Sequence, residues 1–426
     1  MPINPIKTSG SVASGFEPVR ELFEAQMHGM AECEAQLCVY FRGERVVDLW
    51  AERGVKNFDA DSLVNIFSSG KSFEAIAIAS LVDKGLLVYE QPIASYWPEF
   101  AANGKGAITV ADLMRHEAGM AVFDSSLQIS DLYRDGIKQN AVGEIIQKQS
   151  PDADAEGKIE RRYHAMTRGW IANELFRRVD PDGRTIGEYL RDDLCGPLQA
   201  DVVVGVQDDR WAKVASVFPL SFGYQFLQSL LPRALGRRIV HNFLYVFTLF
   251  LRILPDFVKS KGFGAPVPVE GMKNLEIFND REFARGETPS ANTHASARGL
   301  ARVAAMLAAG GTYDGKTYLS QQGWTAMHDN SVEAEMSGIL RTRFTQGGVD
   351  RYQPVLDGNR FDTALNSGRE GFYGWMGLGG SIFQWHPELQ IGFGFVPTAL
   401  HSLDILNERG KNFQRAVLAC VRESEN

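Results

Sequence analysis

The sequence predicts a mixed α/β protein whose antiparallel sheet is built from both ends of the chain. Strand patterns lie close to the two termini, and the long middle segment has a mostly helical pattern. No internal repeat of about 20–50 residues breaks this order. We therefore expect a single domain over 1–426, with helices flanking the sheet. Its sheet lobe would come from about 1–95 and 286–426, and its mostly helical lobe from about 96–285.

Turn and stop signals define the elements of the first part. Cys38–Trp50 predicts two strands joined by a turn at Arg42-Gly43-Glu44. An apolar run from Ser72 to about Lys84 predicts a helix, and Gly85 is placed to end it.

The last part of the chain predicts a helix, two strands around a turn, and a final amphipathic helix. The helix is expected at Ala295–Ala309, where Gly310-Gly311 would end it. The two strands are expected at Gly379–His386 and Gln390–Val396, joined by a turn near Pro387. The final helix is expected at Ser402–Arg422. Pairing of these strands with the first two would complete the sheet lobe.

Composition narrows the function classes. The chain is 44% hydrophobic and 23% charged, as in an ordinary globular protein, and its formal net charge of −8 argues against a general nucleic-acid binder. The four cysteines show no CxxC spacing and the eight histidines no HExxH pair. We expect buried thiols, no metal and no organic cofactor.

Residues 214–254 form the most apolar region. Glycine, proline and glutamine interrupt its first uncharged run, and the second, Ile239–Leu251, is too short to span a bilayer. A buried helix pair is the favoured interpretation. The alternatives are a lid over an apolar pocket or a helix resting on a membrane surface, which the flanking arginines at 233, 237, 238 and 252 would suit. Because the N-terminus has no apolar signal core, we expect a cytoplasmic protein. It would be associated with a membrane if a helix of residues 214–254 rests on the membrane surface.

Ser68-Ser69-Gly70-Lys71 is the only place where a lysine follows a serine by three residues. It precedes the predicted helix, where residues three apart share a face, so Lys71 can reach the Ser68 hydroxyl. The positive end of a helix and burial both favour a neutral lysine, which can act as a base. The backbone N–H of Ser68 would be free to stabilise an oxyanion. The alternative is a polar helix start beside a solvated lysine.

Two further segments are candidates for the same site. Tyr163-His164-Ala165 precedes a helical pattern, and cationic neighbours would lower the pKa of Tyr163 and suit it to proton transfer. The glycine-rich segment from Tyr373 to Ser381 indicates close approach of backbone to a ligand. The alternative for Tyr163 is a half-buried aromatic side chain without a catalytic role. The alternative for the glycine-rich segment is a turn that leads into a hairpin.

Taken in order, these motifs resemble the serine β-lactamase and penicillin-binding-protein superfamily, whose signature includes S-x-x-K. The chain looks most like the class C β-lactamase-related esterases, the family VIII carboxylesterases. The segment from Leu113 to Gly119, with His116, resembles the family's leucine-rich, histidine-glycine segment. The resemblance runs from about Phe16 to the final helix and implies a β-lactamase/transpeptidase-like fold.

The resemblance also implies roles for individual residues. Ser68 would be the acylated nucleophile, Lys71 its base, and Tyr163 a proton relay. The backbone N–H groups of Ser68 and Leu378 would form the oxyanion hole, and His116 would be structural. Substrate-binding positions would be Trp375, Met376 and Gly377.

Two positions differ from the family pattern, and both favour neutral esters with short or medium acyl chains as the substrates. Ala165 stands where penicillin-recognising relatives commonly have an asparagine, and Trp375 where their strand has a cationic residue. Both changes weaken the case for β-lactam or D-Ala-D-Ala chemistry. The remaining alternatives are a β-lactamase or D-amino-acid peptidase, an acyltransferase, and a catalytically silent scaffold.

Two other classes are disfavoured by the sequence. Gly70-Lys71-Ser72 matches the end of a P-loop, but Asn65 stands where that motif needs its first glycine. No G-x-S-x-G occurs, which argues against an α/β-hydrolase.

Overall fold

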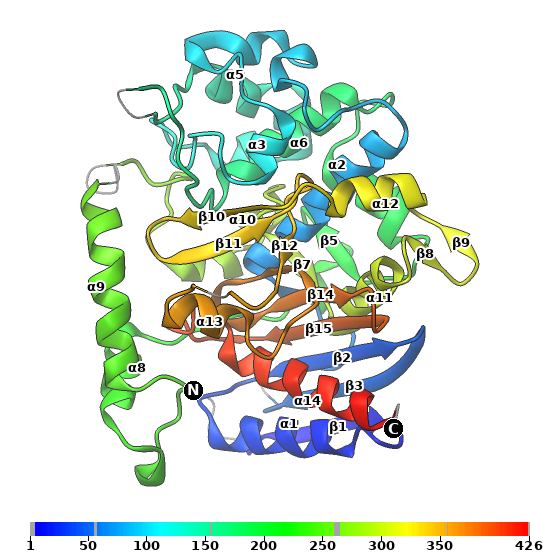
Figure 1. Ribbon diagram of the computed structural model, residues 1–426, viewed down its shortest axis with the longest axis vertical. Helices are drawn as coiled ribbons and strands as arrows, with labels where there is room; N and C mark the ends of the chain where they lie inside the picture. The colour runs from blue at the N-terminus through cyan, green and yellow to red at the C-terminus, as the bar shows by residue number, and fades with distance from the viewer. Residues whose placement is uncertain (1–4, 55–57, 154–155, 260–264, 356, 425–426) are drawn as a thin grey trace.

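The computed structural model describes residues 5–54, 58–153, 156–259, 265–355 and 357–424. Its main sheet is antiparallel and takes strands from both ends of the chain (Figure 1), which confirms the predicted fold class. In spatial order the strands are β1 (Lys7–Val12), β3 (Glu44–Glu52), β2 (Ala35–Phe41), β15 (Ile391–Pro397), β14 (Ile382–His386), β13 (Tyr373–Met376), β12 (Asp350–Arg351), β11 (Leu340–Phe344) and β10 (Val332–Met336).

Strand β15 shows how the sequence places helices on both faces of this sheet. Side chains alternate along a strand, so the IGFGF pattern sends phenylalanines to one face and glycines to the other. Phe393 and Phe395 lie in the core under α1 (Glu17–Gly29) and α14 (Glu408–Ser424). On the opposite face, a Cβ at Gly392 or Gly394 would overlap the backbone of α11 (Ala297–Ala308), so glycine lets that helix lie close.

The remaining elements are short strands and helices. The strands are β4 (Val64–Asn65), β7 (Thr293–Ala295) and β5 (Val202–Val204) in one sheet, with the pairs β6 (Phe218–Pro219) and β16 (Ala399–Leu400), and β8 (Thr312–Tyr313) and β9 (Lys316–Thr317). The helices are α2 (Lys71–Asp83), α3 (Val110–Met114), α4 (Arg134–Lys138), α5 (Ala141–Lys148), α6 (Thr167–Val179), α7 (Ile186–Tyr189), α8 (Phe222–Leu230), α9 (Phe243–Lys259), α10 (Arg281–Arg285), α12 (Gln321–His328) and α13 (Arg360–Asn366). In the described chain, none of the helices is both long and apolar enough to cross a bilayer.

The predicted hairpins are present, with one shifted boundary. Arg42 and Gly43 both have positive φ angles, as a tight turn between β2 and β3 requires. Strand β14 begins at Ile382 rather than at Gly379, because Gly379 and Gly380 take φ angles of 81° and 128° in a tight turn.

The final helix begins at Glu408, six residues later than predicted. The residues before it form successive turns, in which Asp404 N–H donates to the His401 carbonyl and Asn407 N–H to the Asp404 carbonyl. Asn407 has a φ of 50°, outside the range of a right-handed helix. Its side chain is used for a tertiary contact, described below.

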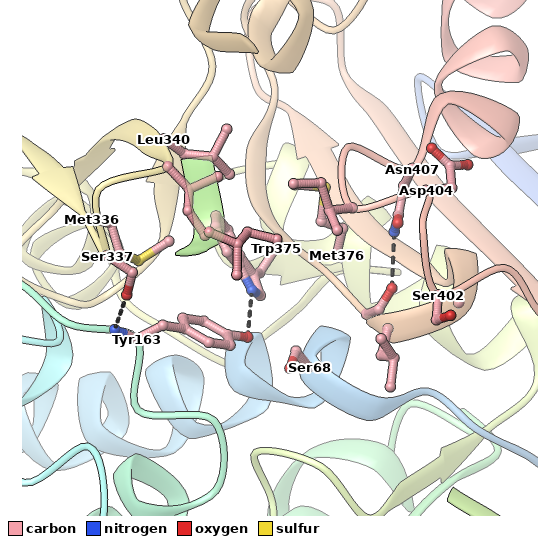
Figure 2. A pocket seen from close by; sticks show the side chains of 16 residues that line it. Ser68, Tyr163, Met336, Ser337, Leu340, Trp375, Met376, Ser402, Asp404 and Asn407 are labelled. Atoms are coloured by element: carbon pink, nitrogen blue, oxygen red, sulfur yellow. Dashed lines mark hydrogen bonds between the residues drawn. The ribbon is translucent and has the colours of Figure 1, made fainter. Parts of the chain in front are cut away.

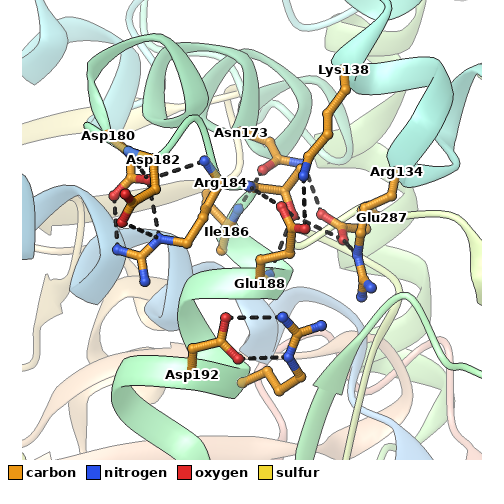
Figure 3. Close-up of polar contacts among 12 residues, drawn as sticks. Arg134, Lys138, Asn173, Asp180, Asp182, Arg184, Ile186, Glu188, Asp192 and Glu287 are labelled. Atoms are coloured by element: carbon orange, nitrogen blue, oxygen red, sulfur yellow. Dashed lines mark hydrogen bonds and ion pairs between the residues drawn. The ribbon is translucent and has the colours of Figure 1, made fainter.

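The middle of the chain contains the short strands β5 and β6 as well as the predicted helices. Buried polar contacts tie several of these helices to the segment that follows α10 (Figure 3). Glu287 is buried and accepts hydrogen bonds from Arg134 Nε (2.8 Å), Thr185 Oγ1 (3.0 Å) and Asn173 Nδ2 (3.3 Å). This network fixes the backbone three residues before Ser290.

The favoured interpretation of residues 214–254 as a buried helix pair is wrong. Helices α8 and α9 lie on one side of the molecule (Figure 1), and only one face of α9 packs inward, through Tyr245, Val246 and Leu249. Large apolar side chains on the outer side of both helices are exposed, such as Leu227 of α8 by 64% and Leu244 of α9 by 59%. The sequence is apolar all round the helices, which is the usual pattern of burial, but no other described element covers the outer face.

Candidate active site

Ser68 and Lys71 lie on one face of a continuous helical segment. A 3-10 turn at Phe67–Gly70 leads directly into α2, so the helix begins earlier than the predicted Ser72. Lys71 Nζ is 3.3 Å from Ser68 Oγ. The i, i+3 spacing in the sequence therefore brings the two functional groups together, as predicted.

The residue before Ser68 adopts an unusual backbone conformation. Phe67 has a φ of 47°, which is rare for a residue with a large side chain. Its N–H donates to Asn65 Oδ1 at 2.7 Å, and its ring packs against Phe278 with centroids 4.8 Å apart. These contacts hold a sharp bend between β4 and α2 that presents Ser68 to the cavity.

The Lys71 amine is buried and surrounded by acceptors. Besides Ser68 Oγ, it contacts the carbonyl oxygens of Ala165 (2.7 Å) and Ser290 (3.0 Å). Burial lowers the pKa of Lys71 well below its ordinary value, and the nearby Arg168 guanidinium adds to this, against the opposing effect of Glu74. The neutral amine is therefore favoured in this environment.

Two backbone carbonyls orient the lone pair of a neutral Lys71. A neutral amine has two hydrogens and one lone pair, and a carbonyl oxygen can only accept. With both hydrogens donated to Ala165 and Ser290, the lone pair is directed to Ser68 Oγ. The arrangement can accept the Ser68 hydroxyl proton.

Tyr163 lies beside Ser68 and accepts a hydrogen bond from Trp375 Nε1 at 3.0 Å (Figure 2). Burial raises the pKa of its phenol, whereas hydrogen bonds from Ser68 and Trp375 lower it; the net direction is up. The predicted decrease in the pKa of Tyr163 is therefore wrong, because burial outweighs the groups that lower it. Tyr163 is thus a protonated phenol that can pass a proton on.

These side chains meet at a cavity of about 360 Å³. Ser68, Tyr163, Trp375, Met376, Gly377 and Leu378 all contribute to its lining, so every sequence-predicted site residue except Lys71 borders it, and Lys71 contacts Ser68 from behind. The β10–β11 hairpin adds apolar side chains, and α9 adds Ile253. The exposed surface of the cavity is mostly apolar.

The cavity lining that the structure describes contains no lysine or arginine. Its one charged side chain is Asp404, which accepts a hydrogen bond from His241 Nε2 at 2.9 Å. Burial alone would raise the pKa of Asp404. The hydrogen bond and the charge of His241, together with the charge of Arg409, outweigh burial, and the pKa of Asp404 is lower than its ordinary value. A substrate carboxylate would find no cation among these lining groups.

The end of β13 is held close to the turn that carries Ser68. A Cβ at Gly377 would overlap the Ile66 carbonyl oxygen, so only glycine allows this approach. Asn407 Nδ2 donates to the carbonyls of Gly377 (3.0 Å) and Ser381 (2.9 Å), and Arg409 donates to that of Gly379. Asn407, just before α14, and Arg409, within it, therefore hold the turn that carries Leu378, which lines the same cavity as Ser68.

Several positioning residues were not found from the sequence. Arg168 forms a buried ion pair with Glu74 at 2.8 Å and donates to the Lys71 carbonyl at 2.8 Å. Glu74 accepts from Ser290 Oγ, which fixes the residue whose carbonyl contacts Lys71. Glu74 is followed by the mostly apolar run Ala75–Val82, and a buried acid beside such a run is the signal that could have identified it.

His116 lies behind the site and contacts Tyr163 with ring centroids 4.9 Å apart. Its Nδ1 accepts from the His164 N–H at 3.0 Å, so the ring fixes the backbone next to Tyr163. Over the described ranges, no cluster of three or more histidine, cysteine, aspartate or glutamate side chains could hold a metal ion.

Comparison with known proteins relates this geometry to a family. A family model described as Beta-lactamase matches residues 19–412. Esterase/beta-lactamase LipL of Mycobacterium tuberculosis (strain ATCC 25618 / H37Rv) is 31% identical over 404 residues, which are 92% of this chain and 83% of that protein.

Solved structures agree with the family model. A penicillin-binding protein homologue from Caulobacter crescentus is 27% identical with a TM-score of 0.73, and the match covers 97% of this chain and 100% of that one. A family VIII carboxylesterase is 26% identical with the same TM-score and the same coverage. Both the fold and the relatives are those expected from the motifs, and the chain belongs to the beta-lactamase family of serine hydrolases.

Proposed function

We propose that this protein is a serine carboxylesterase that hydrolyses neutral esters of short or medium acyl chains through an acyl-enzyme on Ser68. The observation that carries the proposal is the convergence of Ser68, Lys71 and Tyr163 at one apolar cavity whose described lining has no lysine or arginine. The names of two relatives, an esterase/beta-lactamase and a family VIII carboxylesterase, support it.

In the first half-reaction the acyl group of the ester is transferred to Ser68. Lys71 Nζ accepts the Ser68 hydroxyl proton as Oγ attacks the ester carbonyl carbon. The resulting oxyanion would be stabilised by the backbone N–H groups of Ser68, at the start of the helix, and Leu378, at the end of β13. As the C–O bond to the alcohol breaks, Tyr163 donates its phenol proton to the leaving oxygen and regains one from the Lys71 ammonium.

The second half-reaction reverses these transfers. A water molecule in the position vacated by the alcohol attacks the acyl carbon, and its proton goes to the neutral Lys71 amine, either directly or through Tyr163, which passes its own phenol proton on to Lys71 as it takes the new one. Collapse of the second tetrahedral intermediate releases the carboxylic acid and returns the proton to Ser68 Oγ. An alcohol in place of water would give acyl transfer by the same steps.

Trp375 and Ala165 set the preference for neutral esters over β-lactams. The Trp375 indole offers apolar surface and a neutral N–H donor, so it supplies no charge for an antibiotic or peptide carboxylate. Ala165 has no side-chain amide to hold an acylamide group, and its carbonyl contacts Lys71. A β-lactamase is the second candidate, because one relative carries that activity in its name.

The proposal is tested with p-nitrophenyl butyrate and a chromogenic cephalosporin, each given to the wild type and to Ser68→Ala. We expect ester turnover that the substitution abolishes, together with little cephalosporin cleavage. Cephalosporin cleavage as efficient as ester turnover would make the protein a β-lactamase. Ester turnover that survives Ser68→Ala would reject Ser68 as the nucleophile, and an inactive wild type would leave acyl transfer or a silent scaffold.

A further inference from the structure

Helices α8 and α9 expose a large apolar surface, which we call the α8–α9 face. Among the described residues, ten of the sixteen large hydrophobic side chains that are exposed lie between 222 and 254. Their exposed fractions run from 42% to 70%. They are Phe222, Leu227, Leu230, Leu235, Phe243, Leu244, Phe247, Phe250, Leu251 and Leu254. Such a concentration marks an interaction surface rather than scattered surface residues.

The face is a single surface made by two packed helices. Phe222 of α8 contacts Phe250 of α9 with ring centroids 5.8 Å apart, and Phe226 contacts Phe243 at 6.0 Å. The turn between the helices carries Leu235, which is 70% exposed. Inward contacts, such as that of Tyr245 with Phe361 at 5.4 Å, anchor α9 to the body of the protein. The face is therefore a fixed feature of the fold.

The charge of this region is opposite to that of the whole protein. Residues 214–254 contain four arginines and no aspartate or glutamate, although the formal net charge of the chain is −8. Arg252 is held inward, where it donates to the Ile339 carbonyl at 3.0 Å. Arg233 and Arg237 lie in the turn between the helices, beside the exposed Leu235. The charged groups of the face thus suit an anionic partner.

We propose that the α8–α9 face docks the protein onto the surface of an anionic lipid bilayer. Apolar side chains that protrude beside arginines match a membrane interface, where the former enter the acyl region and the latter meet lipid phosphates. The helices lie on the surface, since neither is long enough to span it. Ile253 of α9 also lines the active-site cavity, so the docked face and the cavity share a helix. Docking does not depend on the proposed esterase function.

Vesicle co-sedimentation of the full chain tests this proposal. We expect the wild type to pellet with vesicles of equal parts phosphatidylglycerol and phosphatidylcholine, less with pure phosphatidylcholine, and less at high salt. The triple variant Leu227→Gln, Leu235→Gln, Leu244→Gln should lose about a hundredfold or more in partition. A matched triple variant on other exposed positions, Val88→Gln, Val122→Gln, Val332→Gln, should bind as the wild type does.

A charge variant gives an independent measurement. Arg233→Gln, Arg237→Gln leaves the apolar side chains in place and should weaken binding to anionic vesicles about fivefold per arginine, with little effect on neutral ones. Circular dichroism and p-nitrophenyl butyrate turnover in solution show whether each variant is folded, separately from vesicle binding.

Three results would overturn docking to lipid. One is a wild type that stays in the supernatant with anionic vesicles, and another is wild-type binding by the triple glutamine variant. The third is a stable dimer in analytical ultracentrifugation that the triple variant abolishes, without vesicle binding by either protein. That result would make the face an interface between two copies of the chain.

Discussion

At the scale of single residues, the decisive group is the buried amine of Lys71. Ordinary lysine is protonated at neutral pH, but burial and the charge of Arg168 lower the pKa of Lys71 in the folded protein. The two carbonyls at Ala165 and Ser290 then leave its lone pair for Ser68. The proposed reaction requires this neutral form.

The pH dependence of the esterase activity should follow the protonation of the Lys71 amine. Since its folded pKa is lowered, the amine is neutral above that value, and kcat/KM should fall as the pH decreases through it. The acid limb should therefore lie well below 10.5. Steady-state rates with p-nitrophenyl butyrate across the stable pH range measure it. Activity that increases only near the ordinary lysine pKa would contradict a neutral Lys71.

Lys71→Arg provides a matched control, because it keeps a long basic side chain that stays protonated. We expect this variant to lose about 10²–10⁴-fold in kcat, as is typical for removal of a general base. Retention of activity would show that positive charge alone is sufficient at this position.

The Trp375 indole is the second residue-scale test. Trp375→Phe keeps an aromatic ring but removes the donor to Tyr163 Oη. Loss of one hydrogen bond of about 1 kcal/mol should lower kcat about fivefold and shift the basic limb of the pH profile upward, because that bond lowers the pKa of Tyr163. A change in KM alone would assign Trp375 to substrate contact only.

At the scale of elements, the site depends on segments that come together from distant parts of the chain. The turn before α2, the segment ending at Ser290 and the end of β13 each supply one part. Motifs predicted Ser68, Lys71, Tyr163 and Trp375, because their chemistry is local or matches a family pattern. The contacts of Ser290 and Asn407 depend on tertiary packing and have no local signal.

Two differences between the predicted and the observed structure also arise from tertiary contacts that have no local signal. The residues after Ser402 have the hydrophobic pattern of a helix, but Asn407 instead donates to two carbonyls beside the cavity. The α8–α9 pair has the apolar pattern of buried helices, yet one face stays exposed. In both cases hydrophobicity alone could not indicate what each segment contacts.

Glu287 tests the network that supports Ser290. Glu287→Ala removes a buried carboxylate that pairs with Arg134 and binds Thr185, and we expect a loss of about 3–5 kcal/mol in the free energy of unfolding. Chemical denaturation measures this. Lys138→Ala is the control, because its partially exposed pair with Glu188 should contribute only about 0–1 kcal/mol. Equal effects of the two substitutions would contradict the role given to Glu287.

At the scale of the whole molecule, the core forms without covalent cross-links. All four cysteines are free and buried, and burial raises the pKa of each thiol, that of Cys33 to about 11. We expect Ellman's reagent to react slowly with the native protein and with four thiols after denaturation. Reaction with fewer than four thiols in denaturant without reductant would reveal a disulfide.

The central claim is that Ser68 carries the acyl group during turnover. The most direct measurement is peptide mass mapping after reaction with a fluorophosphonate, which forms a stable adduct on an activated serine. We predict one adduct, on the peptide that contains Ser68, and none in Ser68→Ala or when Lys71 is replaced by arginine. An adduct on another residue, or an unlabelled wild type that still hydrolyses p-nitrophenyl butyrate, would contradict the account.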